Sequence, residues 1–395
     1  MLVSRTRRLD LAEDALSEAF ARASTRWPRD GVPTNPPGWL YTTAARVVTS
    51  RLRSEAVEGR KAPLLAVRPN SAPVVTTDRL DDLADDRLEL ILLCCHPALP
   101  EASRSALALR LVVGTSTEEI ARLFLVPTAT MAARITLAKK KIVGAGIPLV
   151  LPVHEELRAR LDEVCRTIYL AFTAGYAPGT GPDLVRADLA GEAVRLAAVL
   201  HHLVPDAPQV RALLVLVTLQ HARSDARVRD GRLVTLADQD RALWHRDELH
   251  AGLVLGESLA PTDGYAEELR LQALIAVEHA RATTADATNW SAIAARYNEL
   301  EMLTNSPVVR LNRAVAVAEA DGPGAGLALL AGLDGRLATH HRLHAVRADL
   351  ARRAGDLVLA RDCYALALDL CANDVEREYL TERLSTVLER LEASQ

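Results

Sequence analysis

Aromatic residues are scarce in this chain of 395 residues and make up 4 % of the total. β-Sandwiches and β-barrels are rich in aromatic and β-branched residues, so folds of that kind are disfavoured. The hydrophobic share of 49 % rests mainly on leucine, alanine and valine, which suit close-packed helices. Only the short segment Arg232–Leu236 alternates as a strand would. The composition therefore predicts an all-α protein, and a length of 395 residues suggests two or three domains.

The chain also has few cysteines and no long apolar run. The five cysteines are an odd number without CxxC spacing. Cys94, Cys95 and His96 look like metal ligands, but adjacent cysteines rarely share one ion, and the run ELILLCC favours a buried, reduced pair. The longest apolar run, Ala212–Leu219, is far shorter than the ~20 residues of a membrane helix. The first residues lack the apolar core of a signal peptide, so we expect a reduced cytoplasmic protein without a membrane partner.

Motifs of common enzymes are missing as well. The sequence contains no HExxH, GxxxxGK[ST] or GxSxG motif. A dense polar cluster between apolar segments is interpreted as a structural corner, with a ligand contact as the alternative. Its members are Asp238, Gln239, Asp240, Arg241 and Trp244. We expect no catalysis, no cofactor and no bound metal.

Charge is unevenly distributed along the chain. The net charge is −4, but residues 1–150 carry +5 and residues 151–395 carry −9. Within the first part, residues 101–150 contain seven basic and three acidic side chains. Because clustered basic residues are typical of polyanion binding, we expect only the front of the molecule to meet a nucleic acid.

Proline- and glycine-rich stretches indicate the domain boundaries. Residues 59–79 contain three prolines and no helical period, which predicts a flexible linker. A second boundary falls at GAGIPLVLP, Gly144–Pro152. The predicted division is 1–58, linker 59–79, 80–147, 148–282 and 283–395.

Residues 116–142 have the pattern of a helix-turn-helix. Ser116 and Glu119 have the spacing of a capping box, and Pro127 suits the start of a second helix. The apolar positions at helical spacing are Ile120, Ala121, Leu123 and Phe124, then Met131, Ile135, Ala138 and Ile142. The polar and basic positions left outward include Thr128, Thr130, Arg134, Lys140 and Lys141. Such a helix fits the major groove of DNA, while a helical hairpin with a solvated basic end is the alternative.

The first fifty residues predict two further interaction surfaces. Residues 10–20 form an acidic amphipathic pattern that suits a basic protein partner. The later segment WLYTTAARVVTSRLRSE begins with Trp39 and Tyr41 and then becomes basic. Aromatic groups beside a basic helix suit unstacked single-stranded bases, although Trp39 and Tyr41 in the core would be the simpler interpretation.

The last hundred residues contain a trace of a helical repeat. Gly355, Ala360, Tyr364 and Ala367 have the small–small–aromatic–small spacing of a tetratricopeptide repeat (TPR). Gly322 lies 33 residues before Gly355, although the copy that it begins is poor. We favour a helical-repeat array over an irregular bundle.

The order of these segments resembles the sigma-70 family of bacterial transcription initiation factors. Within it, the chain is similar to the extracytoplasmic-function (ECF) group with a long helical C-terminal extension. The matching stretches at the front are DLAEDALSEAFARASTRWPRDGVPTNPPGWL, LELILLCCHPALP and TSTEEIARLFLVPTATMAARITLAKKKIVGAGIP. LVTLADQDRALW and SPVVRLNRAVAVAEADGP continue the resemblance into the extension.

The resemblance implies sigma region 2 in residues 1–58 and sigma region 4 in residues 80–147, with core RNA polymerase and promoter DNA as partners. A regulatory protein or ligand would act on the C-terminal extension. The implied polymerase-binding residues are Asp10, Glu13, Asp14, Leu16 and Phe20. The implied −10 contacts are Trp39, Arg46, Arg51 and Arg53. The implied −35 contacts are Thr128, Thr130, Arg134, Lys139, Lys140 and Lys141.

Some positions depart from the family pattern. Chains of the family usually begin some way upstream with a helix that this sequence largely lacks, so region 2 is expected to be short at its N-terminus. Ala44-Ala45-Arg46 stands in place of Ala-Arg-Asn, and Ser50 replaces an acidic residue. Ala133 and Leu137 occupy recognition-helix positions that are usually polar. An alternative function is therefore a helical-repeat adaptor that binds proteins and whose degenerate sigma front no longer initiates transcription.

Overall fold

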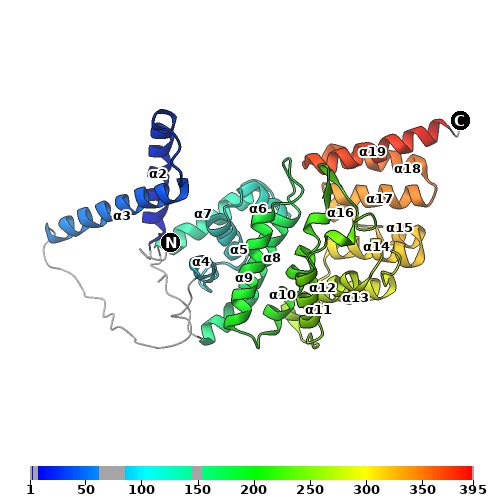
Figure 1. The fold of residues 1–395 in the computed structure, drawn as a ribbon, viewed down its shortest axis with the longest axis horizontal. Helices are drawn as coiled ribbons and strands as arrows, with labels where there is room; N and C mark the ends of the chain where they lie inside the picture. Colours follow the sequence, from blue (N-terminus) through cyan, green and yellow to red (C-terminus); the bar gives the residue numbers. More distant parts are fainter. Residues whose placement is uncertain (1, 3–7, 62–84, 145–153, 394–395) are drawn as a thin grey trace. The chain divides into compact units, whose positions relative to one another are not determined.

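A computed structural model describes residues 2, 8–61, 85–144 and 154–393. Within these residues the fold is almost entirely helical, as the composition predicts (Figure 1). Two short strands, β1 (Val228–Arg229) and β2 (Arg232–Leu233), pair antiparallel. β2 lies within the predicted strand-like segment Arg232–Leu236, whereas β1 was not predicted. The chain forms two compact units, residues 1–112 with 129–160 and residues 113–128 with 161–395.

The helices of the first unit include the two long front helices and the second helix of the predicted helix-turn-helix. They are α2 (Leu9–Asp30), α3 (Pro36–Lys61), α4 (Asp86–Cys94), α5 (Glu101–Ala108), continued by the π-helical segment Leu109–Val113, and α7 (Thr128–Gly144). α3 extends to Lys61, past the start of the predicted linker at residue 59. Linker residues 62–79 lie outside the described residues.

Small residues let α2 and α3 pack closely. Ala15 and Ala19 of α2 and Ala44 of α3 are fully buried in one cluster with Leu11 and Val47. Because the contact is made largely by methyl groups, the charged side chains of both helices remain at the surface. The predicted apolar side of residues 10–20 is therefore confirmed.

All five cysteines are buried free thiols. Cys94 and Cys95 lie at the end of α4, whose apolar face is buried. Burial raises the pKa of the Cys94 thiol to about 12. A thiol that stays protonated binds metal poorly, which supports the interpretation of Cys94 and Cys95 as a buried, reduced pair.

The second unit contains the first helix of the predicted helix-turn-helix and the whole extension. Its helices are α6 (Thr117–Leu123), most of α8 (His154–Tyr176), α9 (Ala187–Leu203), α10 (Pro208–His221), α11 (Arg246–Gly256), α12 (Gly264–Arg281), α13 (Trp290–Thr304), α14 (Pro307–Asp321), α15 (Pro323–Leu329), α16 (Asp334–Leu337), α17 (His341–Arg353), α18 (Leu357–Leu370) and α19 (Asp374–Glu392). Two short 3₁₀ segments, Ser224–Ala226 and Arg241–Leu243, lie between α10 and α11.

The repeat-like spacing at the C-terminus corresponds to the helical hairpin of α17 and α18. Gly355 lies in the turn with a φ of 89°, a conformation that favours glycine. Ala360, Tyr364 and Ala367 are buried in one cluster against α17. In the preceding hairpin of α14 and α15, Gly326 lies close against α14, because an added Cβ would lie 2.6 Å from the carbonyl oxygen of Ala314. The poor copy is therefore also a close-packed hairpin.

Asn373 connects two distant segments of the second unit. It is fully buried and accepts hydrogen bonds from the backbone N–H groups of Val375 and Glu376, which caps α19. Its amide nitrogen donates to the carbonyl oxygens of Pro178 and Asp183. One side chain thus fixes the loop after α8 to the start of the last helix.

Among the described residues, no single helix is both long and apolar enough to cross a bilayer. One bent pair, Thr117–Leu123 with Thr128–Gly144, passes the same test by length and composition.

Candidate nucleic-acid interface

The helix-turn-helix begins with the capping box that the sequence predicts. The Ser116 hydroxyl accepts a hydrogen bond from the N–H of Glu119, whose carboxylate accepts one from the N–H of Ser116. Ile120 and Ala121 are buried, whereas Leu123 and Phe124 are only half-buried. The prediction of a four-residue buried face on α6 is therefore confirmed only in part.

The turn between α6 and α7 is held by its backbone. Leu125 has a left-handed φ of 52°, unusual for a branched side chain. The N–H of Val126 donates to the carbonyl oxygen of Ala121 across this turn. Pro127 directly precedes α7, where its lack of an N–H group costs no helical hydrogen bond.

The faces of α7 match the predicted recognition helix. Met131, Ile135, Ala138 and Ile142 are buried, as their spacing predicts. α7 has four basic side chains and no acidic one. Of the six predicted −35 contacts, Thr128, Thr130, Lys140 and Lys141 are exposed, and Arg134 and Lys139 are half-buried. The helix therefore presents threonine hydroxyls near its N-terminus and positive charge toward its C-terminus.

The predicted polymerase-binding helix, α2, combines acidic and exposed apolar side chains. Leu16 is 39 % exposed and Phe20 is 54 % exposed, although both side chains are large and apolar. Asp14 is exposed, and Asp10 and Glu13 are half-exposed. Apolar groups ringed by charge are typical of a surface that binds another protein.

The predicted −10 helix, α3, leaves its arginines at the surface. Arg46, Arg51 and Arg53 are exposed. Trp39 is half-buried and packs edge-on against Trp27 of α2, with 5.6 Å between the ring centroids. Trp27 was not anticipated from the sequence, although the stretch WPRDGVPTNPPGW begins and ends with these two tryptophans.

Several predicted site residues form ion pairs with one another. Arg51 of α3 donates to Asp14 of α2 over 2.6 Å and lies 3.9 Å from Glu18. Lys139 of α7 forms an ion pair with Glu13 of α2 in the same unit. Residues predicted to bind DNA therefore pair with residues predicted to bind polymerase. Such exposed pairs are weak and exchange readily for other partners.

A contact that the sequence did not reveal joins α6 to the extension. Arg186, just before α9, lies 3.1 Å from the carboxylate of Glu119. Burial opposes the ionisation of Glu119, but hydrogen bonds from Ser116 and the charge of Arg186 lower its pKa below the ordinary value overall. Glu119 therefore caps α6 and binds the extension at the same time.

The polar cluster at residues 238–244 lies where the chain turns between α10 and α11. Trp244 is buried, and the guanidinium of Arg241 lies 4.3 Å from the centroid of its ring. Arg241 also donates to the carbonyl oxygen of Ala282 over 2.6 Å. Asp240 caps the 3₁₀ segment through the N–H of Ala242. These contacts support the interpretation as a corner between helices.

Three segments of the chain match known families. Residues 1–57 match sigma-70 region 2, residues 89–142 match sigma-70 region 4, and residues 160–260 match a family of unknown function, DUF6596. The chain is 40 % identical over 388 residues to the uncharacterized protein R00370 of Rhizobium meliloti (strain 1021). That alignment covers 96 % of this chain and 90 % of the relative. No solved structure gives a significant match.

Proposed function

Because this chain belongs to the sigma-70 family of sigma factors, which bind core RNA polymerase and promoter DNA, we propose that it is a factor of the ECF type. It would direct polymerase to promoters by reading their −10 and −35 elements. The match to region 2 ends at residue 57 and the match to region 4 begins at residue 89. The short connection between these two matched regions, residues 58–88, supports the ECF type.

The observation that carries this proposal is the composition of α7. Its buried apolar face fixes the helix against the protein, and the exposed remainder has basic but no acidic side chains. With the N-terminus of α7 in the major groove, Thr128 and Thr130 would reach base edges or phosphates. Lys140 and Lys141 would neutralise phosphates, which positions the helix without reading sequence.

In the same mechanism, α2 and α3 would act on polymerase and on the −10 strand. Leu16 and Phe20 would bury their exposed apolar groups against polymerase, with Asp10, Glu13 and Asp14 facing its basic residues. Trp39 would stack on an unpaired base, and Arg46, Arg51 and Arg53 would follow the phosphates of the opened strand. The ion pairs that join α2 to α3 and α7 would exchange for these partners.

We further propose that the C-terminal extension regulates the factor by restraining α6. The extension carries a net charge of −9 and Arg186 binds Glu119 of α6, which support this role. A restraint on the first helix of a helix-turn-helix limits how the second can dock. The signal would be a protein or ligand that binds the extension and changes this restraint.

Run-off transcription in vitro tests promoter recognition. The full chain and core polymerase are combined with a library of promoter fragments, and products are sequenced. We expect transcripts whose yield is lowered by Arg134→Ala and by Arg46→Ala. Arg361→Ala, which removes an exposed arginine of α18, should leave the yield unchanged. If the chain neither yields a transcript nor captures polymerase, the helical-repeat adaptor replaces this proposal.

Regulation by the extension is tested on the same promoters. We expect Arg186→Ala, which releases Glu119, to raise the transcript yield. Arg195→Ala removes an exposed arginine of α9 that pairs within its own helix and is the matched control. A yield equal to that of the unsubstituted chain would contradict regulation through this contact and leave promoter recognition untouched.

A further inference from the structure

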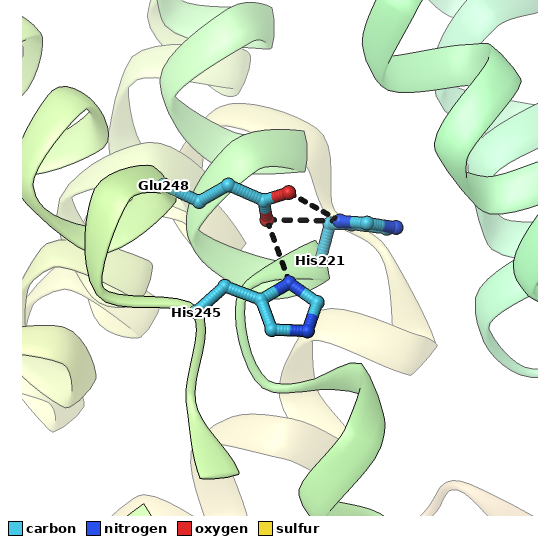
Figure 2. A group of neighbouring side chains, drawn as sticks. All are labelled: His221, His245 and Glu248. Atoms are coloured by element: carbon cyan, nitrogen blue, oxygen red, sulfur yellow. Dashed lines mark hydrogen bonds and ion pairs between the residues drawn. The ribbon is translucent and has the colours of Figure 1, made fainter. Parts of the chain in front are cut away.

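His221, His245 and Glu248 lie together between α10 and α11 (Figure 2). His221 is the last residue of α10, His245 directly precedes α11, and Glu248 lies in its first turn. One nitrogen or oxygen atom from each side chain lies within 4.8 Å of the other two. The three side chains come from segments that are 27 residues apart at most, so the corner between the helices brings them together.

The distances in this cluster suit a small cation. Glu248 Oε2 lies 2.8 Å from His221 Nδ1 and 3.5 Å from His245 Nδ1. In a tetrahedral zinc site, bonds of 2.0–2.1 Å place neighbouring ligand atoms about 3.3 Å apart. Figure 2 shows both imidazole rings presenting a nitrogen to the same carboxylate. Small rotations of these side chains would therefore create three ligand positions.

A fourth residue fixes the orientation of one ring. His245 Nε2 lies 2.9 Å from the carboxylate of Asp225. A proton on this nitrogen, donated to Asp225, leaves the lone pair on Nδ1 directed toward Glu248. Histidines that bind metals commonly donate their other nitrogen to a carboxylate in this way. Asp225 is therefore placed as an outer partner of the site.

The charge of the cluster also favours a cation. Among the described residues, no lysine or arginine forms an ion pair with Asp225 or Glu248. A second group in the extension, His341, Cys371 and Glu376, differs in this respect. There Arg342 binds the carboxylate of Glu376 over 2.9 Å, so a fixed positive charge already satisfies it. The first cluster is the better cation site for this reason.

We propose that His221, His245 and Glu248 bind a divalent transition-metal ion of the zinc class, with Asp225 orienting His245. Two imidazole nitrogens and one carboxylate oxygen are ligands that zinc accepts, with water completing the coordination. The ion would join the end of α10 to the start of α11. This inference is independent of promoter recognition and concerns the part of the chain that matches DUF6596.

Metal titration of the full chain, without an affinity tag, tests the site. The protein is first treated with a chelator and then titrated with Zn²⁺ in competition with a chromophoric chelator. We expect one tightly bound ion per chain and a higher melting temperature with the ion present. His221→Gln and Glu248→Gln should each weaken binding by at least about 100-fold, and Asp225→Asn by about 10- to 100-fold.

The controls separate this site from other histidines and from the second cluster. His250→Ala removes an exposed histidine of α11 and should bind Zn²⁺ like the unsubstituted chain. Co²⁺ in place of Zn²⁺ should give an absorption spectrum without a thiolate charge-transfer band. Circular dichroism without metal checks the fold of each variant, and Asp225→Asn, at an exposed side chain, remains informative if the other two unfold.

Three results would overturn the proposal. The first is that the unsubstituted chain binds no stoichiometric Zn²⁺. The second is that folded His221→Gln and Glu248→Gln, or Asp225→Asn if those two unfold, bind it as tightly as the unsubstituted chain. The third is a thiolate band that disappears in Cys371→Ser, which would assign the ion to the second cluster.

Discussion

The front helices and the extension differ in how enclosed their most buried ion pairs are. In α2 and α3 the ion pairs lie at the surface, and the side chains of Arg51 and Asp14 are 43 % and 64 % exposed. The extension contains more enclosed pairs: the side chains of Arg270 and Glu267 are 10 % and 17 % exposed. Exposed pairs contribute little to stability and can change partners, whereas an enclosed pair keeps its partner because losing it would leave a buried charge uncompensated. The difference matches a front that binds other molecules and an extension that maintains its own shape.

The largest effect should come from Asn373, a fully buried polar group of the extension. Asn373→Ala removes the cap of α19 and leaves the carbonyl oxygens of Pro178 and Asp183 without this donor. We expect a loss of about 3 kcal/mol in the free energy of unfolding. Urea unfolding followed by circular dichroism measures it. Asn289→Ala removes a comparable but exposed cap from α13 and should cost only about 1 kcal/mol.

Gly326 gives a smaller effect that tests the close packing of α14 on α15. In Gly326→Ala the new Cβ would meet the Ala314 backbone and the Ala318 side chain at 2.6 Å. We expect a loss of about 2 kcal/mol, since overpacking forces the helices apart. Gly324→Ala, in the same helix but in open space, should instead stabilise by about 0.5–1 kcal/mol. Equal effects of the two substitutions on thermal unfolding would show that this contact is not close-packed.

The bases of α7 should affect promoter binding through salt dependence. If its four basic side chains contact phosphates, the slope of log affinity against log salt includes about −3.6 from this helix. Lys140→Ala should reduce its magnitude by about 0.9 and weaken binding about fivefold, or ~1 kcal/mol. Titrations of a promoter fragment at several salt concentrations give the slope. An unchanged slope would mean that Lys140 does not approach the phosphates.

The smallest effect should be the coupling between Asp14 and Arg51. A double-mutant cycle with Asp14→Asn and Arg51→Gln should give at most about 0.5 kcal/mol, lost at high salt. The same cycle on Glu267 and Arg270, with glutamine at both positions, should give about 1 kcal/mol and survive added salt. The hydrogen bond from Arg270 lowers the pKa of Glu267, which agrees with a stronger pair. Equal couplings would remove the proposed contrast between the two regions.

Features set by local spacing were predictable from the sequence. The capping box of α6 and the buried residues of α7, from Met131 to Ile142, depend on residues within one or two helical turns. The all-α fold followed from composition. The hairpin of α17 and α18 was predictable because small residues at helix crossings leave a recognisable spacing.

Contacts between distant segments could not be predicted in this way. Asn373 binds carbonyl groups about 190 residues away, and nothing in its own surroundings indicates them. Arg186 and Glu119 are separated by α8 and by the predicted boundary at Gly144–Pro152. His221 and His245 lack the fixed spacing of a known metal motif, so the sequence led us to expect no metal. Only the folded corner between α10 and α11 brings them together.

The contact of Arg186 with Glu119 has a consequence for how such a chain could be rearranged by recombination. The first helix of the helix-turn-helix depends on the extension for the partner of its capping carboxylate. A chimera that joined this front to an unrelated tail would keep both helices yet leave Glu119 without its arginine. The extension therefore cannot be replaced without loss of this contact. A recombinant chain that preserved the contact would have to include Arg186 together with the helix-turn-helix.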